Sequence, residues 1–379
     1  MRIAVVTETY PPEINGVALT VRGFVDQLTR LGHGVQLVRP RQPAAPAAEP
    51  PNNVHETLVA GARIPRYPGL RFGLPAARRL RALWTRERPD TAYIATEGPL
   101  GYSALKVAIE LGIPAATGFH TRFDDFVAHY GAAWLTPAVF AWLRRFHNRA
   151  NATLVPTREL REFLSSNGFD NVRVLSRGVD TVQFAPQRRD PALRAEWSLD
   201  EDDLAVLFVG RIAPEKNLDL VVRSYDAIRA VVPGTRMVWI GDGPALARLR
   251  RDHPGHVFCG MQRGIELARH FASGDLFLFP SVTETFGNVT LEALASGVPP
   301  VAFNYGAAGE LVRDGIDGRA VPMHDADAFV AAAVALAIDR PLRASMRVSG
   351  RQVVANLSHA AVAHALADLL EGLRERRAA

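Results

Sequence analysis

Two stretches of the chain show the same order of apolar and polar positions. In each, a short apolar run is followed by a polar loop and then by apolar residues at helical spacing. The first stretch predicts a strand over residues 2–6, a helix over 17–31 and a strand over 35–38. The second predicts a strand over 204–210, a helix that starts at Leu218 and a strand over 237–241. Further apolar runs predict strands at 91–95, 115–118, 152–155, 173–175, 257–259, 276–279 and 300–302. Strands that alternate with amphipathic helices are typical of parallel sheets covered on both faces.

A polar segment separates the two stretches. Residues 184–203 contain two prolines and the charge clusters RRD and DEDD, which are typical of an exposed linker. The chain has 379 residues, which is enough for two or three domains. We therefore expect an N-terminal α/β domain over 1–183 and a C-terminal one over 184–379. Ser358 is placed to cap a closing helix over 358–376, whose apolar face comprises Val362, Leu366, Leu369, Leu370 and Leu373.

The composition excludes several classes of protein. With 48% hydrophobic and 22% charged residues the chain is not disordered throughout. Cys259 is the only cysteine, which excludes a disulfide framework and a cysteine-based metal cluster. The longest apolar run, 328–338, is about half of the ~20 residues of a membrane-spanning helix. The N-terminus has no signal-peptide cleavage region. We expect a cytoplasmic protein.

Basic residues are concentrated in the first half of the chain. Residues 1–185 hold 22 Lys and Arg against 15 Asp and Glu, whereas 186–379 hold 22 against 24. Eight arginines and one acid lie between Arg63 and Arg88. Such a basic half suggests attraction to an anionic membrane or polyanion. An arginine-rich face exposed to solvent explains the pattern equally well.

Large apolar residues accompany the arginines in two segments. In 63–88 they are Tyr67, Leu70, Phe72, Leu74, Leu80, Leu83 and Trp84. In a predicted helix over 132–149 they are Trp134, Leu135, Phe140, Trp142 and Phe146, beside Arg144, Arg145 and Arg149. This combination suggests a peripheral contact with anionic lipid at the inner face of the cell membrane. A buried core helix is the favoured alternative for the second segment.

Loops at the carboxyl ends of parallel strands are where open α/β sheets bind ligands. The loop after the first strand reads TETYPPEINGV, and its Gly16 stands just before a helix, where backbone amides can approach an anion. An ordinary helix-entry glycine is the alternative. Neither this loop nor the one after 204–209 contains G-x-G-x-x-G, which disfavours a dinucleotide-dependent oxidoreductase.

The loop GRIAPEKN at 210–217 carries two cations beyond a strand end. A guanidinium at Arg211 and an ammonium at Lys216 suit a diphosphate, whose charge grows as it departs. Only Lys106 and Lys216 among the 44 basic residues are lysines, so this lysine stands out against the arginine bias. A solvated loop is the alternative.

The third loop has the most specific pattern, FLFPSVTETFGNVTLEALASGVP. Glu284 falls in the loop after the predicted strand, and Phe286-Gly287-Asn288 opens a helix. Glu292 then lies about one turn inside that helix. The amides at the helix start form an anion site between the two acids, and the carboxylates can accept ribose and sugar hydroxyls.

These motifs resemble a known family. VGRIAPEKN, ETFGNVTLEALASGVP and ETYPPEINGV closely resemble the retaining nucleotide-sugar glycosyltransferases of family 4, and SRGVDTVQFAP at 176–186 resembles their inter-domain stretch. The resemblance implies the GT-B fold, an α/β architecture of two Rossmann-like doubly wound parallel-sheet domains facing a central cleft. The C-terminal helix is then expected to pack back on the N-terminal acceptor domain, and the C-terminal domain to bind the donor. GFHTRFDDFVAHYG, RFHNRA and TLVPT look most like bacterial GDP-mannose-dependent α-mannosyltransferases, and relatives that make sulfoquinovosyl lipid look similar.

The resemblance also implies roles for individual residues. Arg211 and Lys216 would hold the donor diphosphate, with Gly16 contacting it from the other domain. Glu292 would bind the ribose. Glu284, with the amides of Phe286, Gly287 and Asn288, would hold the transferred sugar and the phosphates.

Two further positions match the family at the ends of strands. The backbone of Met261 would meet the base, and His120 would lie near the sugar C6 hydroxyl and the reacting centre. Without the motif context, a lone histidine beyond an apolar strand is more often a core residue. Arg263 and Glu266 depart from the donor-loop residues of close relatives, so base selectivity does not carry over.

No metal or other cofactor is expected. Asp325 and Asp327 have the Asp-x-Asp spacing of a cation site, but they open a predicted helix, where Asp is an ordinary N-cap. With Arg211 and Lys216 supplying positive charge, a metal is not needed.

The expected enzyme is a hexosyltransferase that moves mannose from GDP-mannose to an acceptor hydroxyl, such as one on a glycolipid, with retention of configuration. Alternatives are a transferase of glucose or sulfoquinovose from a UDP-sugar to diacylglycerol and, with less support, a GT-B-fold nucleotide-sugar epimerase or a non-enzymatic polyanion binder. No recognisable nucleic-acid-binding module is present.

Overall fold

The computed structural model describes residues 1–13, 15–42, 53–63, 71–120 and 136–378. The chain divides into a first unit, Met1–Gly178 with His359–Ala379, and a second unit, Val179–Ser358. The sequence placed this boundary between residues 183 and 184 and included the last helix in the C-terminal range. The predicted motif GFHTRFDDFVAHYG and parts of both arginine-rich segments, including Tyr67, Leu70, Trp134 and Leu135, fall largely outside the described residues.

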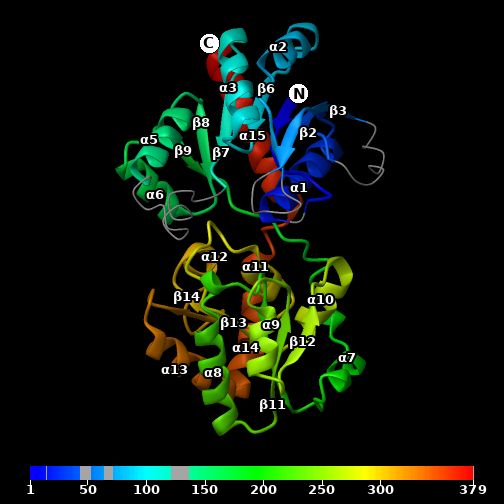
Figure 1. Cartoon of the computed structure of the whole chain (residues 1–379), viewed down its shortest axis with the longest axis vertical. Helices are drawn as coiled ribbons and strands as arrows, with labels where there is room; N and C mark the ends of the chain where they lie inside the picture. Colours follow the sequence, from blue (N-terminus) through cyan, green and yellow to red (C-terminus); the bar gives the residue numbers. More distant parts are fainter. Residues whose placement is uncertain (14, 43–52, 64–70, 121–135, 379) are drawn as a thin grey trace. The chain divides into compact units, whose positions relative to one another are not determined.

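Within the described part of the first unit, seven parallel strands form one sheet in the order β3-β2-β1-β6-β7-β8-β9 (Figure 1). They are β1 (Arg2–Val6), β2 (Gly34–Pro40), β3 (Val54–Val59), β6 (Thr91–Ile94), β7 (Ala115–Gly118), β8 (Ala152–Val155) and β9 (Val172–Val174). The prediction of a parallel sheet is confirmed. A short antiparallel pair, β4 (Gly61–Arg63) and β5 (Arg71–Gly73), lies apart from this sheet.

Helices cover both faces of the first sheet because its central strands are apolar on both sides. Ile3 and Val5 share a core with residues of 21–28 and 362–373, whereas Ala4 and Val6 share another with residues of 80–84 and 100–108. This split follows from the alternation of side chains along a strand. The helices described in this unit are α1 (Gly16–Arg30), α2 (Ala77–Arg86), α3 (Pro99–Leu111), α5 (Thr136–His147), α6 (Arg158–Ser166) and α15 (His359–Ala378).

The C-terminal helix α15 returns to the N-terminal unit, which confirms the predicted fold class. It packs beside α1 (red and blue in Figure 1). Four residues of its predicted apolar face are buried and the fifth is partly buried: Val362, Leu366, Leu370 and Leu373, and Leu369. The helix therefore completes a core that residues 1–178 alone would leave open on that side.

The second unit contains a parallel sheet of six strands in the order β12-β11-β10-β13-β14-β15. The strands are β10 (Leu204–Val209), β11 (Thr235–Ile240), β12 (Val257–Gly260), β13 (Leu276–Phe279), β14 (Pro300–Phe303) and β15 (Arg319–Val321). Its helices are η2 (Pro186–Arg188), α7 (Pro191–Glu196), η3 (Pro214–Lys216), α8 (Leu218–Val231), α9 (Leu246–Asp252), α10 (Gly264–Ala272), α11 (Asn288–Ala295), α12 (Gly306–Leu311), α13 (Ala326–Ile338) and α14 (Arg340–Val354).

The prediction of an exposed linker at 184–203 is wrong. Phe184 is buried, with its ring edge-on to Phe271 at a centroid distance of 6.0 Å. The guanidinium of Arg194 is buried as well, and donates to Asp275 and to the carbonyl oxygen of Ser273. Prolines and charges in this segment cap and anchor a short helix on the second unit, so they do not mark an exposed connection.

Candidate functional site

The loops after β10 and β13 begin side by side in the second sheet. β10 pairs with β13 on one side and with β11 on the other, so the order of strands reverses at β10. Such a reversal leaves a crevice at the carboxyl ends of the strands, because the following loops turn to opposite faces. The predicted diphosphate loop and the predicted glutamate loop both start at this point.

Lys216 and Glu284 form an ion pair that joins the two loops. Ser281 completes the cluster, since its hydroxyl donates to Glu284 Oε1 at 2.8 Å and Lys216 Nζ donates to Ser281 Oγ at 3.3 Å. The side chains of Lys216 and Glu284 are only 15% and 19% exposed. An ammonium has three donors, so one remains to donate to a further acceptor such as a phosphate oxygen. We name Lys216, Ser281 and Glu284 the switch-point cluster.

Gly287 shapes the start of α11 next to this cluster. Its φ is +94°, a left-handed conformation that glycine adopts without strain. No side chain caps the helix at this position, so the first amides of α11, including that of Asn288, are open to an anion. The carbonyl oxygen of buried Phe286 accepts the N–H of Ala307 at 2.6 Å, which anchors the loop to α12.

Arg211 stands apart from the switch-point cluster. Its side chain is 47% exposed, and its Nη1 lies 3.5 Å from Glu215 Oε1, a weak contact within its own loop. The backbone beside it is anchored, because the N–H of Ile212 donates to the carbonyl oxygen of Asp242 at 2.9 Å. The structure therefore joins Lys216 with Glu284, whereas Arg211 remains an exposed cation on the same loop.

Glu292 lies on α11 and is half-buried. Burial raises the pKa of its carboxyl to about 7. A carboxyl that titrates near neutrality either donates or accepts a hydrogen bond, depending on pH. Such a group can hydrogen-bond the hydroxyls of a ligand in either protonation state. The pKa shift itself comes from burial and needs no contact with a hydroxyl.

Met261 follows the end of β12 and is 51% exposed. Arg263 Nη2 lies 3.2 Å from its sulfur. Gly260, at φ +67°, turns the chain directly before it. The structure places Met261 at the carboxyl edge of the second sheet, without a contact to the switch-point cluster among the described residues.

His120 lies in the first unit, just after β7, and is buried with both ring nitrogens engaged. Arg177 Nη2 approaches Nδ1 at 2.6 Å, and Tyr93 Oη approaches Nε2 at 2.7 Å. Because a guanidinium can only donate, Nδ1 must accept and the ring proton lies on Nε2. Burial, and secondarily the charge of Arg177, lower the pKa of His120 well below its ordinary value. The imidazole is therefore neutral, and a ring contact with substrate would have to replace one of these bonds.

Gly16 opens α1 in the first unit, as predicted from its position before a helix. Asn15 caps the helix, with Oδ1 accepting the N–H of Ala18 at 2.8 Å. Asn15 Nδ2 in turn donates to Thr9 Oγ1 at 2.7 Å. The cap takes one amide and leaves those of Gly16 and Val17 at an exposed helix start.

The sequence reasoning missed three groups that support these sites. Ser281 lies three residues before Glu284 in the quoted motif, but only the turn after β13 brings its hydroxyl to the carboxylate. Tyr93 and Arg177 lie 27 and 57 residues from His120 along the chain. Tyr93 has the apolar neighbours of a strand residue, and Arg177 is one arginine among many, so neither carries a local signal.

Two buried carboxyls of the first unit were also missed. Glu8 accepts the N–H groups of Gly73 at 2.9 Å and Leu100 at 2.8 Å, and so caps α3 from a distance. Glu97 lies nearby with Oε1 buried and without a partner among the described residues. Burial, with a smaller contribution from Glu8, raises the pKa of Glu97 to about 8.

The Asp-x-Asp pair has structural roles. Asp325 caps α13 by accepting the N–H of Ala328 at 2.9 Å, as predicted, and Asp327 pairs with Arg223. In the parts of the chain that the structure describes, no three His, Cys, Asp or Glu side chains gather as metal ligands would. No described helix combines the length and hydrophobicity that crossing a membrane requires.

Comparison with known proteins decides the family. Residues 14–183 match the model of Glycosyltransferase Family 4, and residues 203–339 match that of Glycosyl transferases group 1. The chain belongs to glycosyltransferase family 4. The glycosyltransferase is 34% identical over 385 residues to a GDP-mannose-dependent alpha-mannosyltransferase of Mycobacterium tuberculosis, covering 100% of this chain and 98% of the relative. It is 30% identical over 328 residues to a sulfoquinovosyl transferase of Arabidopsis thaliana, covering 84% and 62% of the two chains.

The fold of the glycosyltransferase is GT-B. A sucrose-phosphate synthase from Thermosynechococcus elongatus superimposes with a TM-score of 0.79 at 19% identity, covering 98% of each chain. The resemblance stated from the loop motifs is therefore confirmed at the level of family and fold.

The raised pKa of Glu292 predicts that the free energy of unfolding falls as the pH rises. The native state holds the proton more tightly than the unfolded chain, so the stabilisation is complete below about pH 4.5 and is lost as the pH rises through 7. Between these values the wild type should lose about 3 kcal/mol of unfolding free energy relative to Glu292→Gln. Urea denaturation across pH 4.5–8 measures the difference, and Glu201→Gln, at an exposed position of the same unit, is the matched control. Parallel pH profiles for wild type and Glu292→Gln would contradict the burial argument.

Proposed function

We propose that the glycosyltransferase moves mannose from GDP-mannose to a hydroxyl of a glycolipid acceptor with retention of configuration. The observation that carries the proposal is the switch-point cluster: a partly buried lysine paired with a glutamate beside the uncapped start of α11. The name of the mycobacterial relative supports GDP-mannose as donor.

In this proposal the second unit binds the donor. Lys216 and the exposed Arg211 hold the diphosphate, and the amides of Phe286, Gly287 and Asn288 complete the anion site. Glu284 binds the sugar, Glu292 the ribose, and the backbone of Met261 the base. Each assignment follows the family resemblance and agrees with a cation, an amide or a carboxylate at that position.

The chemistry needs charge stabilisation rather than a protein nucleophile. As the bond from the anomeric carbon to the diphosphate breaks, negative charge develops on the leaving oxygen, and Lys216 and Arg211 stabilise it. The acceptor hydroxyl attacks the same face of the sugar, and the departing phosphate oxygen takes its proton. Positive side chains supply the charge, so the proposal requires no metal and no other cofactor.

A second donor class remains a candidate on a specific observation. The sulfoquinovosyl transferase relative is 30% identical over most of this chain. Transfer of sulfoquinovose or glucose from a UDP-sugar to diacylglycerol would use the same switch-point cluster, because the diphosphate is common to both donors.

Peripheral contact with anionic membrane is part of the proposal for the first unit. α5 buries Leu143 and Phe146, so the core-helix alternative describes one of its faces. The helix also exposes Arg144 and Arg145, and Trp142, which stacks on Phe146, is 44% exposed. A partly exposed aromatic ring on a helix that also exposes cations suits the interface of an anionic bilayer.

Lys216→Ala should lower turnover at least about 100-fold, because the lost ammonium stabilises the departing diphosphate by a few kcal/mol. Arg211→Ala should also lower turnover. Initial rates of GDP release with acceptor present measure the effect. The chain offers matched controls in Lys106→Ala, at its only other lysine, and Arg223→Ala, both exposed and ion-paired. Wild-type rates in both site variants would refute the diphosphate assignment.

GDP-mannose should raise the thermal stability of the full-length protein more than UDP-glucose, UDP-GlcNAc or UDP-sulfoquinovose. A donor present at 100 times its Kd stabilises the folded state by about 2.7 kcal/mol. The shift should disappear in Lys216→Ala and persist in Lys106→Ala. Stabilisation by a UDP-sugar without any by GDP-mannose would replace the proposed donor with the second class.

Arg144→Ala/Arg145→Ala should reduce sedimentation with vesicles that contain phosphatidylglycerol, since each basic residue near an anionic surface contributes about 1 kcal/mol. Arg250→Ala/Arg251→Ala removes a neighbouring pair of exposed arginines from α9 and serves as the charge-matched control. Equal sedimentation of wild type and both variants at physiological salt would exclude this contact.

A further inference from the structure

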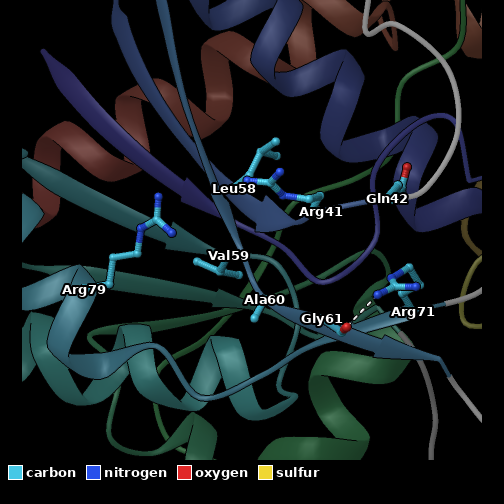
Figure 2. Close-up of a pocket in the computed structure, with 8 residues that line it drawn as sticks. All are labelled: Arg41, Gln42, Leu58, Val59, Ala60, Gly61, Arg71 and Arg79. Carbon is cyan, nitrogen blue, oxygen red and sulfur yellow. Dashed lines mark hydrogen bonds between the residues drawn. The ribbon is translucent and has the colours of Figure 1, made fainter.

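A cavity of about 530 Å³ lies at the carboxyl ends of β2 and β3 in the first unit. Residues 58–61, which have apolar or no side chains, line it, and three arginines from different elements are spaced along it (Figure 2). Arg41 follows β2, Arg71 begins β5 and Arg79 lies near the start of α2. The volume is in the range of small-molecule sites.

Among the residues that the structure describes, the three guanidinium groups have no carboxylate partner. No carboxylate of a described residue lies within ion-pair distance of Arg41, Arg71 or Arg79. Arg71 Nη2 donates to the carbonyl oxygen of Gly61 at 2.5 Å, whereas Arg71 Nε is buried without a partner among the described residues. A buried donor without an acceptor is unfavourable, so a ligand oxygen at this position would be stabilised. Guanidinium groups bind phosphate and carboxylate in a planar, two-point geometry.

Glu13 is the carboxyl that contacts this region, and its hydrogen bonds leave the guanidinium groups uncovered. Oε1 accepts the backbone N–H of Arg71 at 3.3 Å, and Oε2 accepts the hydroxyl of Thr9 at 2.6 Å. Burial raises the pKa of Glu13 above its ordinary value. The lining has three arginines against this one neighbouring carboxyl, so the site is net positive among the described residues.

Hydrogen bonds connect the cavity wall to the loop of Gly16. Gln42, which lines the cavity, donates from Nε2 to the carbonyl oxygen of Tyr10 at 3.0 Å. Glu13 links the main chain of Arg71 to Thr9, and Thr9 accepts from Asn15, the cap of α1. The cavity therefore belongs to the same edge of the first sheet as the loop after β1.

The same edge carries His120 after β7. In the strand order β2-β1-β6-β7, Arg41 and His120 follow strands three steps apart. At about 4.8 Å per step this separation is roughly 14 Å. An extended acceptor of that length could reach both positions along the first unit.

We propose that the cavity lined by Arg41, Arg71 and Arg79 binds a phosphate or carboxylate group carried by the acceptor, while the hydroxyl that reacts lies nearer His120. The inference rests on the proposed function and narrows its acceptor to molecules with an acidic group. It also assigns part of the basic charge of the N-terminal half to a defined site.

Isothermal titration of the full-length protein with inorganic phosphate tests the cavity directly. Saturating GDP is present throughout, so that it occupies a diphosphate site in the second unit. Arg41→Ala and Arg79→Ala should each weaken phosphate binding about tenfold, because each removes a charge-assisted hydrogen bond. Arg78→Ala is the matched control, since it removes the neighbouring exposed arginine of α2, which does not line the cavity. Equal affinities in all four proteins, or an equal loss in all three variants, would overturn the proposal.

Vesicles distinguish the two sources of the anion. If a lipid headgroup presents it, Arg79→Ala should reduce sedimentation with phosphatidylglycerol vesicles more than Arg78→Ala does. If the two variants sediment equally while phosphate affinity still separates them, a soluble acceptor carries the acidic group, and the cavity assignment stands.

The outcome is separable from that of the proposed function. Thermal stabilisation by GDP-mannose should be the same in wild type, Arg41→Ala and Arg79→Ala, because neither arginine is among the residues proposed to bind the donor. If Arg41→Ala and Arg79→Ala bind phosphate as the wild type does while GDP-mannose still stabilises all three proteins, the cavity proposal alone is refuted. If GDP-mannose does not stabilise the protein but Arg79→Ala still weakens phosphate binding, the proposed function is refuted. The cavity would then be an anion site without its proposed role in binding the acceptor.

Discussion

The ion pair of Lys216 with Glu284 is the interaction on which the site of the second unit depends. It joins two loops that are 68 residues apart in sequence and adjacent in space because β10 and β13 pair in parallel. Ser281 and the left-handed turn at Gly287 then set the carboxylate beside the open start of α11. Desolvating a lysine is unfavourable unless a partner compensates, so the carboxylate of Glu284 offsets the cost of holding the ammonium of Lys216 at this largely buried position.

In the first unit, hydrogen bonds satisfy several polar groups that lie within a largely apolar sheet. Tyr93 and Arg177 hydrogen-bond the two ring nitrogens of a neutral His120, and Glu8, just after β1, accepts the N–H of Leu100 at the start of α3. Along the same edge, Arg71 Nε is buried without a partner among the described residues. Satisfied polar groups and unsatisfied ones therefore lie side by side, and the unsatisfied ones are the better candidates for meeting a ligand.

The local pattern of residues was enough to predict the bounds of a strand where both faces of that strand are buried. The strands at 2–6, 115–118, 152–155 and 276–279 have the bounds that the sequence predicts, because central parallel strands are buried on both faces. Strand β3 was missed because it lies at the sheet edge, where its middle residues are polar or only partly buried. The segment 184–203 was assigned as a linker because prolines and charges at an exposed connection cannot be told from those that cap and anchor a short helix.

The sequence by itself determined the two α/β units and the family, and it predicted the loops of the candidate site with Lys216, Gly287 and Glu284, because each of these depends on residues close together in the chain. Only the tertiary structure decided that Ser281 bridges Lys216 and Glu284, that Arg211 stays outside this cluster, and that His120 is neutral between Tyr93 and Arg177. It also decided that Arg41, Arg71 and Arg79 line one cavity. These relations join residues from separate strands and helices, and strand order and packing, which no local pattern specifies, bring such residues within hydrogen-bonding distance.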